Sequence, residues 1–488
     1  MEFGRLKNFI NGDWKESKSK EIWKIKNPGL DEVIGEVPMS TLEEVAEAVQ
    51  SAKDAFPEWR RTTPVSRARY ILRFIELLEE NFEELSIVQT KEHGKTIDES
   101  RGETRRGIEN CEVAAGIPSL MMGESLQDIA SGIDEYVIRE PLGVFACIPP
   151  FNFPFMVPLW FLPYAIATGN TFVVKPSPSD PISQVKLHEL LDEAGVPPGV
   201  VNLVHGGAEV SNALMDNRDI VGVTFVGSTP VAKIIYQKCG EKGKRVIAQG
   251  GAKNFLVIVP DCDLDQTIAS LMTSFYGNAG QRCLSGANAI VIGNDDTFYK
   301  RFIEAFVESA SQIKVGYGLD EGVQMGPLQS VDKKERVIRY IEKGVDENAK
   351  LLLDGRKSKI TGNYPNTCFL YPTVFEDVTP KMSIGKDEIF GPVACIMRAK
   401  NIDQAIDIIH SIPYGNAASI YTTNGGLARK FEYSICAGNI GINIGIVAPM
   451  AFFPFSGMKE SFFGILHGQG KDSIRFFTES KVIIRRWF

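Results

Sequence analysis

Residues 171–204 have the sequence TFVVKPSPSDPISQVKLHELLDEAGVPPGVVNLV, which predicts a strand, a helix and a second strand. The apolar runs TFVV and VVNLV at its two ends contain the β-branched residues that are typical of buried strands. Between them the helix has Asp180 as its expected N-cap, a proline at its first position and Gly195 after its last turn. A strand, a helix and a strand in this order predict a βαβ unit with parallel strands.

The same alternation extends outward from this segment in both directions. On the C-terminal side we predict strands over 220–226, around Val246, and over 255–259, 287–293 and 393–399, with helices over 231–238, 264–276, 296–313 and 402–409. On the N-terminal side we predict helices over 40–56, 67–89 and 97–115, the first opened by a capping box of Ser40 and Glu43. Residues 473–488 are β-prone and end in the apolar Trp487 and Phe488. The chain is therefore predicted to be an α/β protein with two doubly wound domains.

The composition excludes several classes of protein. A hydrophobic share of 44% over 488 residues is typical of a globular chain, and such a length allows about two to four domains. A net charge of -8 offers no clustered basic surface for nucleic acid. The closest two of the eight cysteines, Cys262 and Cys283, are 21 residues apart, so no metal cluster is predicted. The N-terminus shows no export or organelle signal, which predicts a cytoplasmic protein.

One long uncharged segment, residues 141–174, is long enough to cross a bilayer. It contains six prolines and the polar Asn152, which would interrupt a membrane-spanning helix. We therefore predict a buried loop that leads into a core helix, and no contact with a membrane.

A doubly wound domain favours nucleotide binding, but the chain has no complete Gly-x-Gly-x-x-Gly motif. The best candidate for a phosphate-binding turn is FVGSTP at 225–230, where a predicted strand enters a helix through Gly227 and Ser228. Taken alone, such a turn is more often structural than functional.

Cys283 lies in the loop GNAGQRC, residues 277–283, directly after a predicted helix. Most cysteines of a cytosolic protein are inert core residues. Here two glycines and an alanine allow a close approach of the backbone to a ligand, and the polarity of the loop argues against simple core packing. These features favour a functional cysteine.

Seven short motifs follow one another along the chain. They are FNFP at 151–154, TFVVKPS at 171–177, FVGS at 225–228, GGAKN at 250–254, GNAGQRC at 277–283, EIFGP at 388–392 and PFSGMKESFFG at 454–464. In their order and spacing the chain resembles the aldehyde dehydrogenase superfamily along its whole length. Some of the motifs are most similar to the CoA-acylating methylmalonate-semialdehyde dehydrogenase branch.

The resemblance implies that Cys283 attacks an aldehyde to give a thiohemiacetal, which is oxidised to a thioester. Asn152 and the backbone N–H of Cys283 would stabilise the oxyanion, whereas without the motif Asn152 would be interpreted as a turn former. Lys175 would bind the adenosine ribose of NAD, Glu388 would bind the nicotinamide ribose, and Phe390 would lie near the nicotinamide. The full set of implied cofactor residues is Phe151, Lys175, Ser177, Gly227, Ser228, Glu388 and Phe390.

Two departures from the superfamily pattern carry information. The glutamate that activates water in ordinary members lies 34 residues before the nucleophile, and this chain has Gln249 there. Glutamine cannot accept a proton at neutral pH, so we predict transfer of the acyl group to CoA; slow hydrolysis, or another carboxylate acting as the base, is the alternative. Pro178 replaces a glutamate that binds the adenosine hydroxyls in many NAD-dependent members, which leaves NADP open although the branch favours NAD.

Two arginines are predicted to bind a carboxylate on the substrate. Arg282 precedes the nucleophile, and Arg106 lies in RGIEN at 106–110, both as in the similar branch. Guanidinium groups match carboxylates geometrically, but Arg106 could instead form an ion pair with Glu103 or Glu109. Oxidation of a β-carboxylated aldehyde followed by loss of CO2 would give propionyl-CoA or acetyl-CoA.

The resemblance also implies a division into domains. Residues 1–123 and 141–251 would bind the cofactor, 252–442 would be catalytic, 124–140 and 465–488 would form an oligomerisation portion, and 443–464 would return to the cofactor domain. Residues 474–484 would pair with a neighbouring subunit's sheet in a dimer or tetramer. Three hypotheses of function remain, namely a CoA-acylating enzyme, a hydrolytic enzyme for another acidic aldehyde, and a binding protein without turnover.

Overall fold

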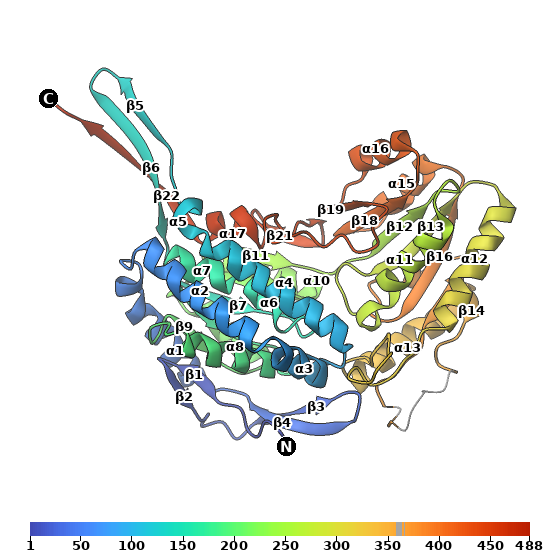
Figure 1. The fold of residues 1–488 in the computed structure, drawn as a ribbon, viewed down its shortest axis with the longest axis horizontal. Helices are drawn as coiled ribbons and strands as arrows, with labels where there is room; N and C mark the ends of the chain where they lie inside the picture. Colours follow the sequence, from blue (N-terminus) through green and yellow to red (C-terminus); the bar gives the residue numbers. More distant parts are fainter. Residues whose placement is uncertain (358–363, 366) are drawn as a thin grey trace.

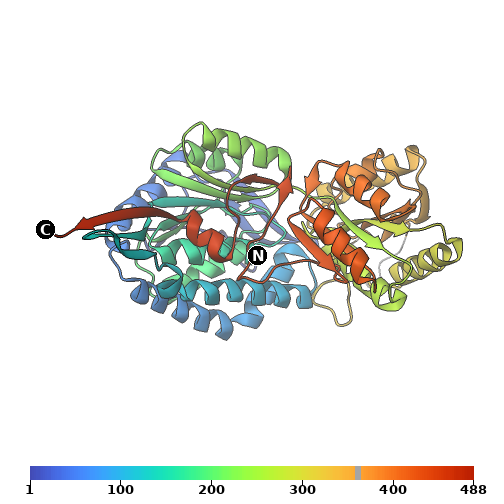
Figure 2. The ribbon, with the colours of Figure 1, turned by 90° about the horizontal axis from the view of Figure 1, so that it is seen from above.

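The computed structural model describes residues 1–357, 364–365 and 367–488. Two sheets form the cores of two lobes, and a three-stranded arm extends from the first lobe together with the C-terminus (Figure 1). The second view shows the same two lobes side by side with the arm at the far end (Figure 2).

The first sheet has the strand order β2-β1-β9-β8-β7-β10-β11-β21. Its five central strands are parallel, namely β9, β8, β7, β10 and β11. Alternate residues of β7 face opposite layers. Phe145 and Cys147 face one core, and Val144, Ala146 and Ile148 face the other. The strands are β1 (Asn8–Ile10), β2 (Asp13–Lys15), β7 (Val144–Ile148), β8 (Thr171–Val174), β9 (Val201–Leu203), β10 (Ile220–Val226), β11 (Arg245–Gln249) and β21 (Phe462–Gly464).

Helices cover both faces of this sheet, so the prediction of a doubly wound sheet is confirmed. One face packs against α1 (Leu42–Trp59), α9 (Ala208–Asp216) and α10 (Thr229–Gly240). The other packs against α2 (Pro64–Glu80), α3 (Phe82–His93), α4 (Ile97–Ala115), α7 (Leu162–Thr168) and α8 (Ile182–Glu193). The short α5 (Ile117–Leu120) and α6 (Met156–Leu159), and α17 (Gly470–Phe476), complete this lobe.

The second sheet has the order β14-β15-β16-β13-β12-β18-β19, and all its neighbours except β14 and β15 pair in parallel. Its strands are β12 (Asn254–Ile258), β13 (Gly286–Ile292), β14 (Lys350–Leu353), β15 (Thr373–Glu376), β16 (Val393–Ala399), β18 (Ala417–Tyr421) and β19 (Asn439–Ile442). Its helices are α11 (Leu264–Tyr276), α12 (Asp296–Ser311), α13 (Val331–Asp346), α14 (Ser383–Lys386), α15 (Ile402–His410) and α16 (Gly425–Ser434).

The arm consists of β5 (Ser125–Ala130), β6 (Ile133–Pro141) and β22 (Thr478–Arg486), with β6 in the centre. Every residue of β22 is paired with β6, which joins the C-terminus to a hairpin far away in the sequence. Two small sheets pair β3 (Ile22–Asn27) with β4 (Glu32–Pro38), and β17 (Tyr414–Gly415) with β20 (Met458–Lys459).

Tertiary contacts changed several predicted details. The capping box lies one residue later than predicted, on Thr41 and Glu44, because the hydroxyl of Ser40 donates to Asn8 Oδ1 at 3.0 Å. The predicted helix over 67–89 is two helices that meet at Asn81, and the predicted strand from residue 473 begins only after α17.

The N-cap predicted for α8 is also wrong. Asp180 does not cap this helix, because the amides of Ile182 and Ser183 donate to the carboxylate of Glu92 at 2.7 and 3.0 Å. A carboxylate from α3 thus replaces the local cap.

Candidate active site

The two sheets meet where the strands of the first sheet end and the strands of the second sheet begin. Only residues 250–253 separate the carboxyl end of β11 from the amino end of β12. The carboxyl ends of the first sheet therefore face the amino ends of the second. In the first sheet β7 is central, β8 and β9 follow on one side, and β10 and β11 follow on the other. The point between β7 and β10, where the strand order reverses, is where doubly wound sheets bind ligands.

A cavity of about 510 Å³ lies between α4 of the first lobe and the loop before β13 of the second. It brings together three residues that the sequence predicted, namely Cys283, Arg106 and Arg282. The rest of its wall comes from α4, from the segment around α6, and from residues 446–455, with Trp160 and Phe455 stacked 4.4 Å apart.

Cys283 lies in a loop with constrained backbone geometry. Asn278 and Ala279 both have left-handed conformations, with φ of 54° and 51°. At Gly280 an added Cβ would lie 2.2 Å from the carbonyl oxygen of Gly391, so only glycine fits there. The carbonyl of Cys283 accepts hydrogen bonds from the side chains of Asn254 and Asn416, both at 2.8 Å. These contacts fix the nucleophile loop (277–283) against the second sheet.

The electrostatic surroundings hold the thiol of Cys283 in its neutral form. Burial, followed by the nearby carboxylate of Glu388, raises the pKa of Cys283 to about 12. Burial also raises the pKa of Glu388 to about 7, although Glu388 accepts a hydrogen bond from the amide of Ala252 at 2.9 Å. The thiolate is the reactive form, so removal of this proton is a required step of any attack by Cys283.

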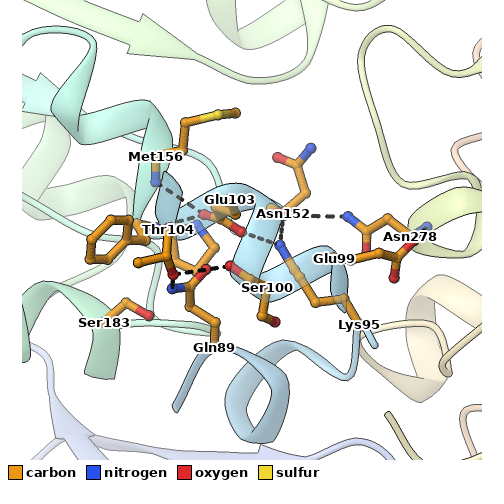
Figure 3. Close-up of polar contacts among 12 residues, drawn as sticks. Gln89, Lys95, Glu99, Ser100, Glu103, Thr104, Asn152, Met156, Ser183 and Asn278 are labelled. Atoms are coloured by element: carbon orange, nitrogen blue, oxygen red, sulfur yellow. Dashed lines mark hydrogen bonds and ion pairs between the residues drawn. The ribbon is translucent and has the colours of Figure 1, made fainter. Parts of the chain in front are cut away.

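Asn152 lies directly against the nucleophile loop. It is buried, and its side-chain amide donates to the carbonyl of Gln281 at 2.9 Å. Its backbone carbonyl accepts from Lys95 Nζ at 2.7 Å, which is one of the contacts drawn in Figure 3. The amide of Asn152 thus reaches the loop that carries Cys283.

Both arginines of the cavity are paired with carboxylates. Arg282 donates to Glu99 at 3.0 Å, and its Nε atom is buried without a partner among the described residues. Arg106 forms an ion pair with Glu109, with 3.2 Å between Nη1 and Oε2, which is one of the two pairings that the sequence analysis considered. Arg106 also lines the cavity. The other partner considered for it, Glu103, is paired with Lys95 instead.

The predicted cofactor residues lie at the same junction. Phe151 follows β7, Lys175 and Ser177 follow β8, and Gly227 and Ser228 follow β10. Glu388 and Phe390 precede β16 of the second sheet, and the rings of Phe390 and Phe151 lie 5.9 Å apart, edge to face.

Several donors at this edge remain available to a ligand. The hydroxyl of Ser228 makes no capping hydrogen bond within the described chain, although Ser228 is the N-cap of α10. Lys175 Nζ donates to the carbonyls of Pro176 and Gly206, both at 2.9 Å, and burial lowers its pKa to about 8. An ammonium group has three donors, so one is left. Ser177 Oγ accepts from the amide of Ser179 at 3.3 Å.

Gln249 ends β11 and is buried. Its side-chain amide donates to the carbonyl of Phe455 at 3.2 Å, and Phe455 lines the cavity of Cys283. The side chain that stands in the position of the usual base is therefore fixed in the wall of the site.

Comparison with known proteins identifies the family. Residues 14–483 match the model of the aldehyde dehydrogenase family. The chain belongs to this family. The predicted resemblance and the predicted fold class, an aldehyde dehydrogenase-like fold with two doubly wound α/β domains and a small β portion, are both confirmed.

Several members of the aldehyde dehydrogenase family are similar over their full length. Malonate-semialdehyde dehydrogenase 1 of Geobacillus kaustophilus is 47% identical and covers 99% of this chain and 98% of its own. A malonate-semialdehyde dehydrogenase of Bacillus velezensis is 46% identical, covering 100% and 98%. A Sinorhizobium meliloti structure, described as that of a methylmalonate-semialdehyde dehydrogenase complexed with NAD, has a TM-score of 0.97, 41% identity, and covers 99% and 98%.

Three residues next to the site were missed by the sequence analysis. Lys95, Glu99 and Glu103 each contact a loop that carries a predicted catalytic residue. A signal was present for the two glutamates, because residues 99, 103 and 106 follow a helical spacing of four and three and therefore share one face of α4. No such pattern includes Lys95, which precedes the helix.

Neither a candidate metal site nor a candidate membrane-spanning helix is found in the part of the chain that the structure describes. Within residues 1–357, 364–365 and 367–488, no three His, Cys, Asp or Glu side chains gather in a way that could hold a metal ion. None of the helices found in these ranges combines the length and apolarity needed to cross a membrane.

Proposed function

We propose that this aldehyde dehydrogenase oxidises a carboxylated semialdehyde, malonate or methylmalonate semialdehyde, and transfers the acyl group to CoA. The observation that carries this proposal is that Cys283 shares one cavity with two guanidinium groups, Arg106 and Arg282. A small aldehyde with a distal carboxylate can place one end at the thiol and the other at these cations. The names of the similar proteins support the same substrate class.

In this proposal Cys283 is the nucleophile and Asn152 an oxyanion donor. The thiolate attacks the aldehyde carbon to form a thiohemiacetal, and its oxygen is held by the amide of Asn152 and the backbone N–H of Cys283. For this the amide of Asn152 exchanges its bond to Gln281 for a bond to the oxyanion. Arg106 and Arg282 fix the distal carboxylate by exchanging part of their pairing with Glu109 and Glu99.

The donor set fits a dinucleotide, and we propose NAD, with NADP left open by Pro178. The start of α10 with Gly227 and Ser228 suits a pyrophosphate, Lys175 offers a free donor for a ribose hydroxyl, and Glu388 accepts from the second ribose. A nicotinamide held by these residues would supply the acceptor for the hydride that leaves the thiohemiacetal as the thioester forms. Phe151, Ser177 and Phe390 form the remaining walls of this proposed site.

The lack of a base at Gln249 favours CoA over water as the acyl acceptor. Four carboxylates line the cavity, and each is paired with a cation, namely those of Asp98, Glu99, Glu103 and Glu109. A thioester in such surroundings lasts until a thiol, which ionises more easily than water, arrives. Loss of CO2 from the resulting β-carboxylated acyl group would give acetyl-CoA or propionyl-CoA.

We extend the proposal to the whole assembly. Residues 1–123 and 141–251 would bind the cofactor, 252–442 would supply Cys283, and 443–464 would return to the cofactor domain. Residues 124–140 and 465–488 would join copies into a cytoplasmic homo-oligomer, a dimer or a tetramer. The exposed apolar side chains of β22, such as Ile484, support this assembly.

The test measures reduced cofactor with malonate or methylmalonate semialdehyde and NAD, with and without CoA. We expect steady turnover with CoA, and without it a burst of about one equivalent per site followed by a stall, because the thioester accumulates. The Cys283→Ala variant should show neither phase, and Cys436→Ala, at an exposed cysteine, should behave as the wild type.

Each alternative predicts a different outcome. Equal steady rates with and without CoA would indicate hydrolysis and contradict acyl transfer. No reduced cofactor with any aldehyde would indicate a binding protein without turnover.

A further inference from the structure

A buried ion pair lies in the wall of the proposed site, and the proposed function gives it no role in binding the cofactor or the substrate. Lys95, directly before α4, and Glu103, on α4, approach to 2.5 Å between Nζ and Oε2. Both side chains are 0% exposed. Removing two charges from water is costly, so such a pair is stable only where further hydrogen bonds satisfy its remaining atoms.

Those further hydrogen bonds all go to one segment, residues 152–156. Lys95 Nζ donates to the carbonyl of Asn152 at 2.7 Å and lies 4.5 Å from the centre of the Phe153 ring. Glu103 Oε1 accepts from the amides of Phe155 and Met156 at 2.9 and 3.0 Å. The ion pair therefore holds the beginning and the end of the segment at once, as Figure 3 shows for Asn152 and Met156.

The segment needs such a hold because it lies between regular elements. It connects the loop after β7 to α6, and it contains Pro154, which has no amide to donate. Within it Asn152 is held on two sides, with its carbonyl on Lys95 and its side-chain amide on Gln281 of the nucleophile loop. The orientation of that amide depends on where Lys95 places the backbone.

The position of Lys95 is itself fixed. An added Cβ at Gly318 would lie 2.2 Å from the carbonyl oxygen of Lys95, so the backbone there is in direct contact with a neighbouring loop. The amide of Ile97 also donates to the carbonyl of Gly318 at 2.9 Å. The backbone that carries the ammonium group is thus held in place by its contacts with Gly318.

We propose that Lys95 and Glu103 are positioning residues for Asn152, and that their ion pair fixes its backbone where its side-chain amide can turn from Gln281 to the oxyanion formed on Cys283. This inference rests on the oxyanion role of Asn152 in the proposed function. A cation suits the position because one ammonium group neutralises Glu103, donates to a carbonyl and faces an aromatic ring at the same time.

The test is a double-mutant cycle between Lys95 and Asn152. The chemical step is followed as the rate constant of the first turnover at saturating aldehyde and NAD without CoA. We expect Asn152→Ala to lower it by about 10²–10³-fold, the effect of removing one oxyanion donor. Lys95→Met should lower it by at least about tenfold with little change in KM, and should add nothing in the Asn152→Ala background, since residues that act as a unit are non-additive.

Loss of one partner leaves a buried charge, so a second variant guards against failure to fold. Lys95→Met with Glu103→Gln removes both charges and keeps an acceptor for the amides of Phe155 and Met156. We expect it to be slow as well. Arg67→Met is the matched control, because it removes a buried cation that donates to Ala167 and Thr62, away from the site, and it should unfold at a lower temperature but keep its rate constant.

The outcomes separate this inference from the proposed function. A folded Lys95→Met/Glu103→Gln protein with the wild-type rate constant, or multiplicative losses for Lys95→Met and Asn152→Ala, would overturn the positioning role. An Asn152→Ala variant with the wild-type rate constant would instead remove the oxyanion role from the proposed function, and the dependence on CoA is measured independently of both.

Discussion

Two titratable side chains dominate the site at the scale of single residues. Cys283 has a pKa raised to about 12, and after burial the largest cause is the carboxylate of Glu388. Glu388 has a pKa raised to about 7, so its charge develops within the physiological range. Ionisation of Glu388 therefore makes the thiol of Cys283 harder to deprotonate.

This coupling predicts a pH-dependent effect of Glu388→Gln. Above pH 7 wild-type Glu388 is charged, and its removal should lower the pKa of Cys283 and speed alkylation by iodoacetamide several-fold at pH 8.5. Below pH 6 Glu388 is already neutral, so the two proteins should react at similar rates. Labelling of Cys283 is followed by peptide mass spectrometry, with Asp387→Asn as the control at the adjacent carboxylate. An equal acceleration at both pH values would contradict this account.

Gln249 offers a gain-of-function prediction. Gln249→Glu places a carboxylate in the wall shared with Phe455, where it can accept a proton from water. We expect reduced cofactor to form beyond about one equivalent per site without CoA, because the thioester is now hydrolysed. Gln249→Met, which has a similar volume and no base, should still stall. If the glutamate variant also stalls, Gln249 does not determine the choice of acceptor.

At the scale of elements, α4 organises both loops of the proposed active site. The carboxylate of Glu99 caps its own helix at Thr96, pairs with Arg282 and accepts from the amide of Asn278. One turn later Glu103 holds the segment that begins with Asn152, and Arg106 then lines the cavity. Residues spaced by four and three lie on one helix face, so a single helix contacts the nucleophile loop and the segment of Asn152 and also lines the cavity.

The same helix provides a matched pair of arginines for a prediction. Arg106 lines the cavity, whereas the neighbouring Arg105 points to Glu79 and the ring of Phe82 on the outside. Arg106→Ala should lower kcat/KM for malonate semialdehyde about 10–100-fold, which corresponds to one lost charge-assisted hydrogen bond of about 1.5–3 kcal/mol.

Two controls accompany this measurement. Arg106→Ala should leave kcat/KM for propionaldehyde, which has no carboxylate, nearly unchanged, and Arg105→Ala should leave both substrates unchanged. An equal loss for the two aldehydes would mean that Arg106 stabilises the site and does not recognise the carboxylate.

At the scale of the whole molecule, the arm leaves several apolar side chains uncovered in a single chain. β22 is an edge strand of its sheet, and Val482 and Ile484 on one of its faces are 59% and 64% exposed. Exposed edges with apolar side chains invite pairing with another copy. The arm is therefore the expected contact between subunits.

Charges on this face should separate the subunits. Val482→Asp with Ile484→Asp is expected to shift the mass measured by light scattering from that of an oligomer toward that of a single chain, because the buried aspartates would lack partners. Tyr433→Asp, at a side chain that is 91% exposed on α16, is the control and should leave the mass unchanged. An unchanged mass for the arm variant would place the subunit contact elsewhere.

Local sequence patterns determined the elements and the family of this protein. Short apolar runs such as TFVV at 171–174 became buried strands, and amphipathic spacing became helices, because burial of one face requires this periodicity. The motifs around Cys283 and Asn152 identified the family, and the change to Gln249 is the basis for proposing CoA as the acyl acceptor.

Only the tertiary structure decided which partners these residues meet. Glu92 rather than Asp180 caps α8, because the deciding carboxylate comes from a segment far away in the sequence. Lys95 rather than Arg106 pairs with Glu103, although Lys95 lies outside α4 and shares no helix face with Glu103. The hydrogen bond from Lys95 to Asn152 joins residues 57 positions apart, so no periodic pattern in the local sequence predicts it. Hydrogen bonds and ion pairs depend on distances in space, and a one-dimensional pattern records these only where the partners share a helix or a strand.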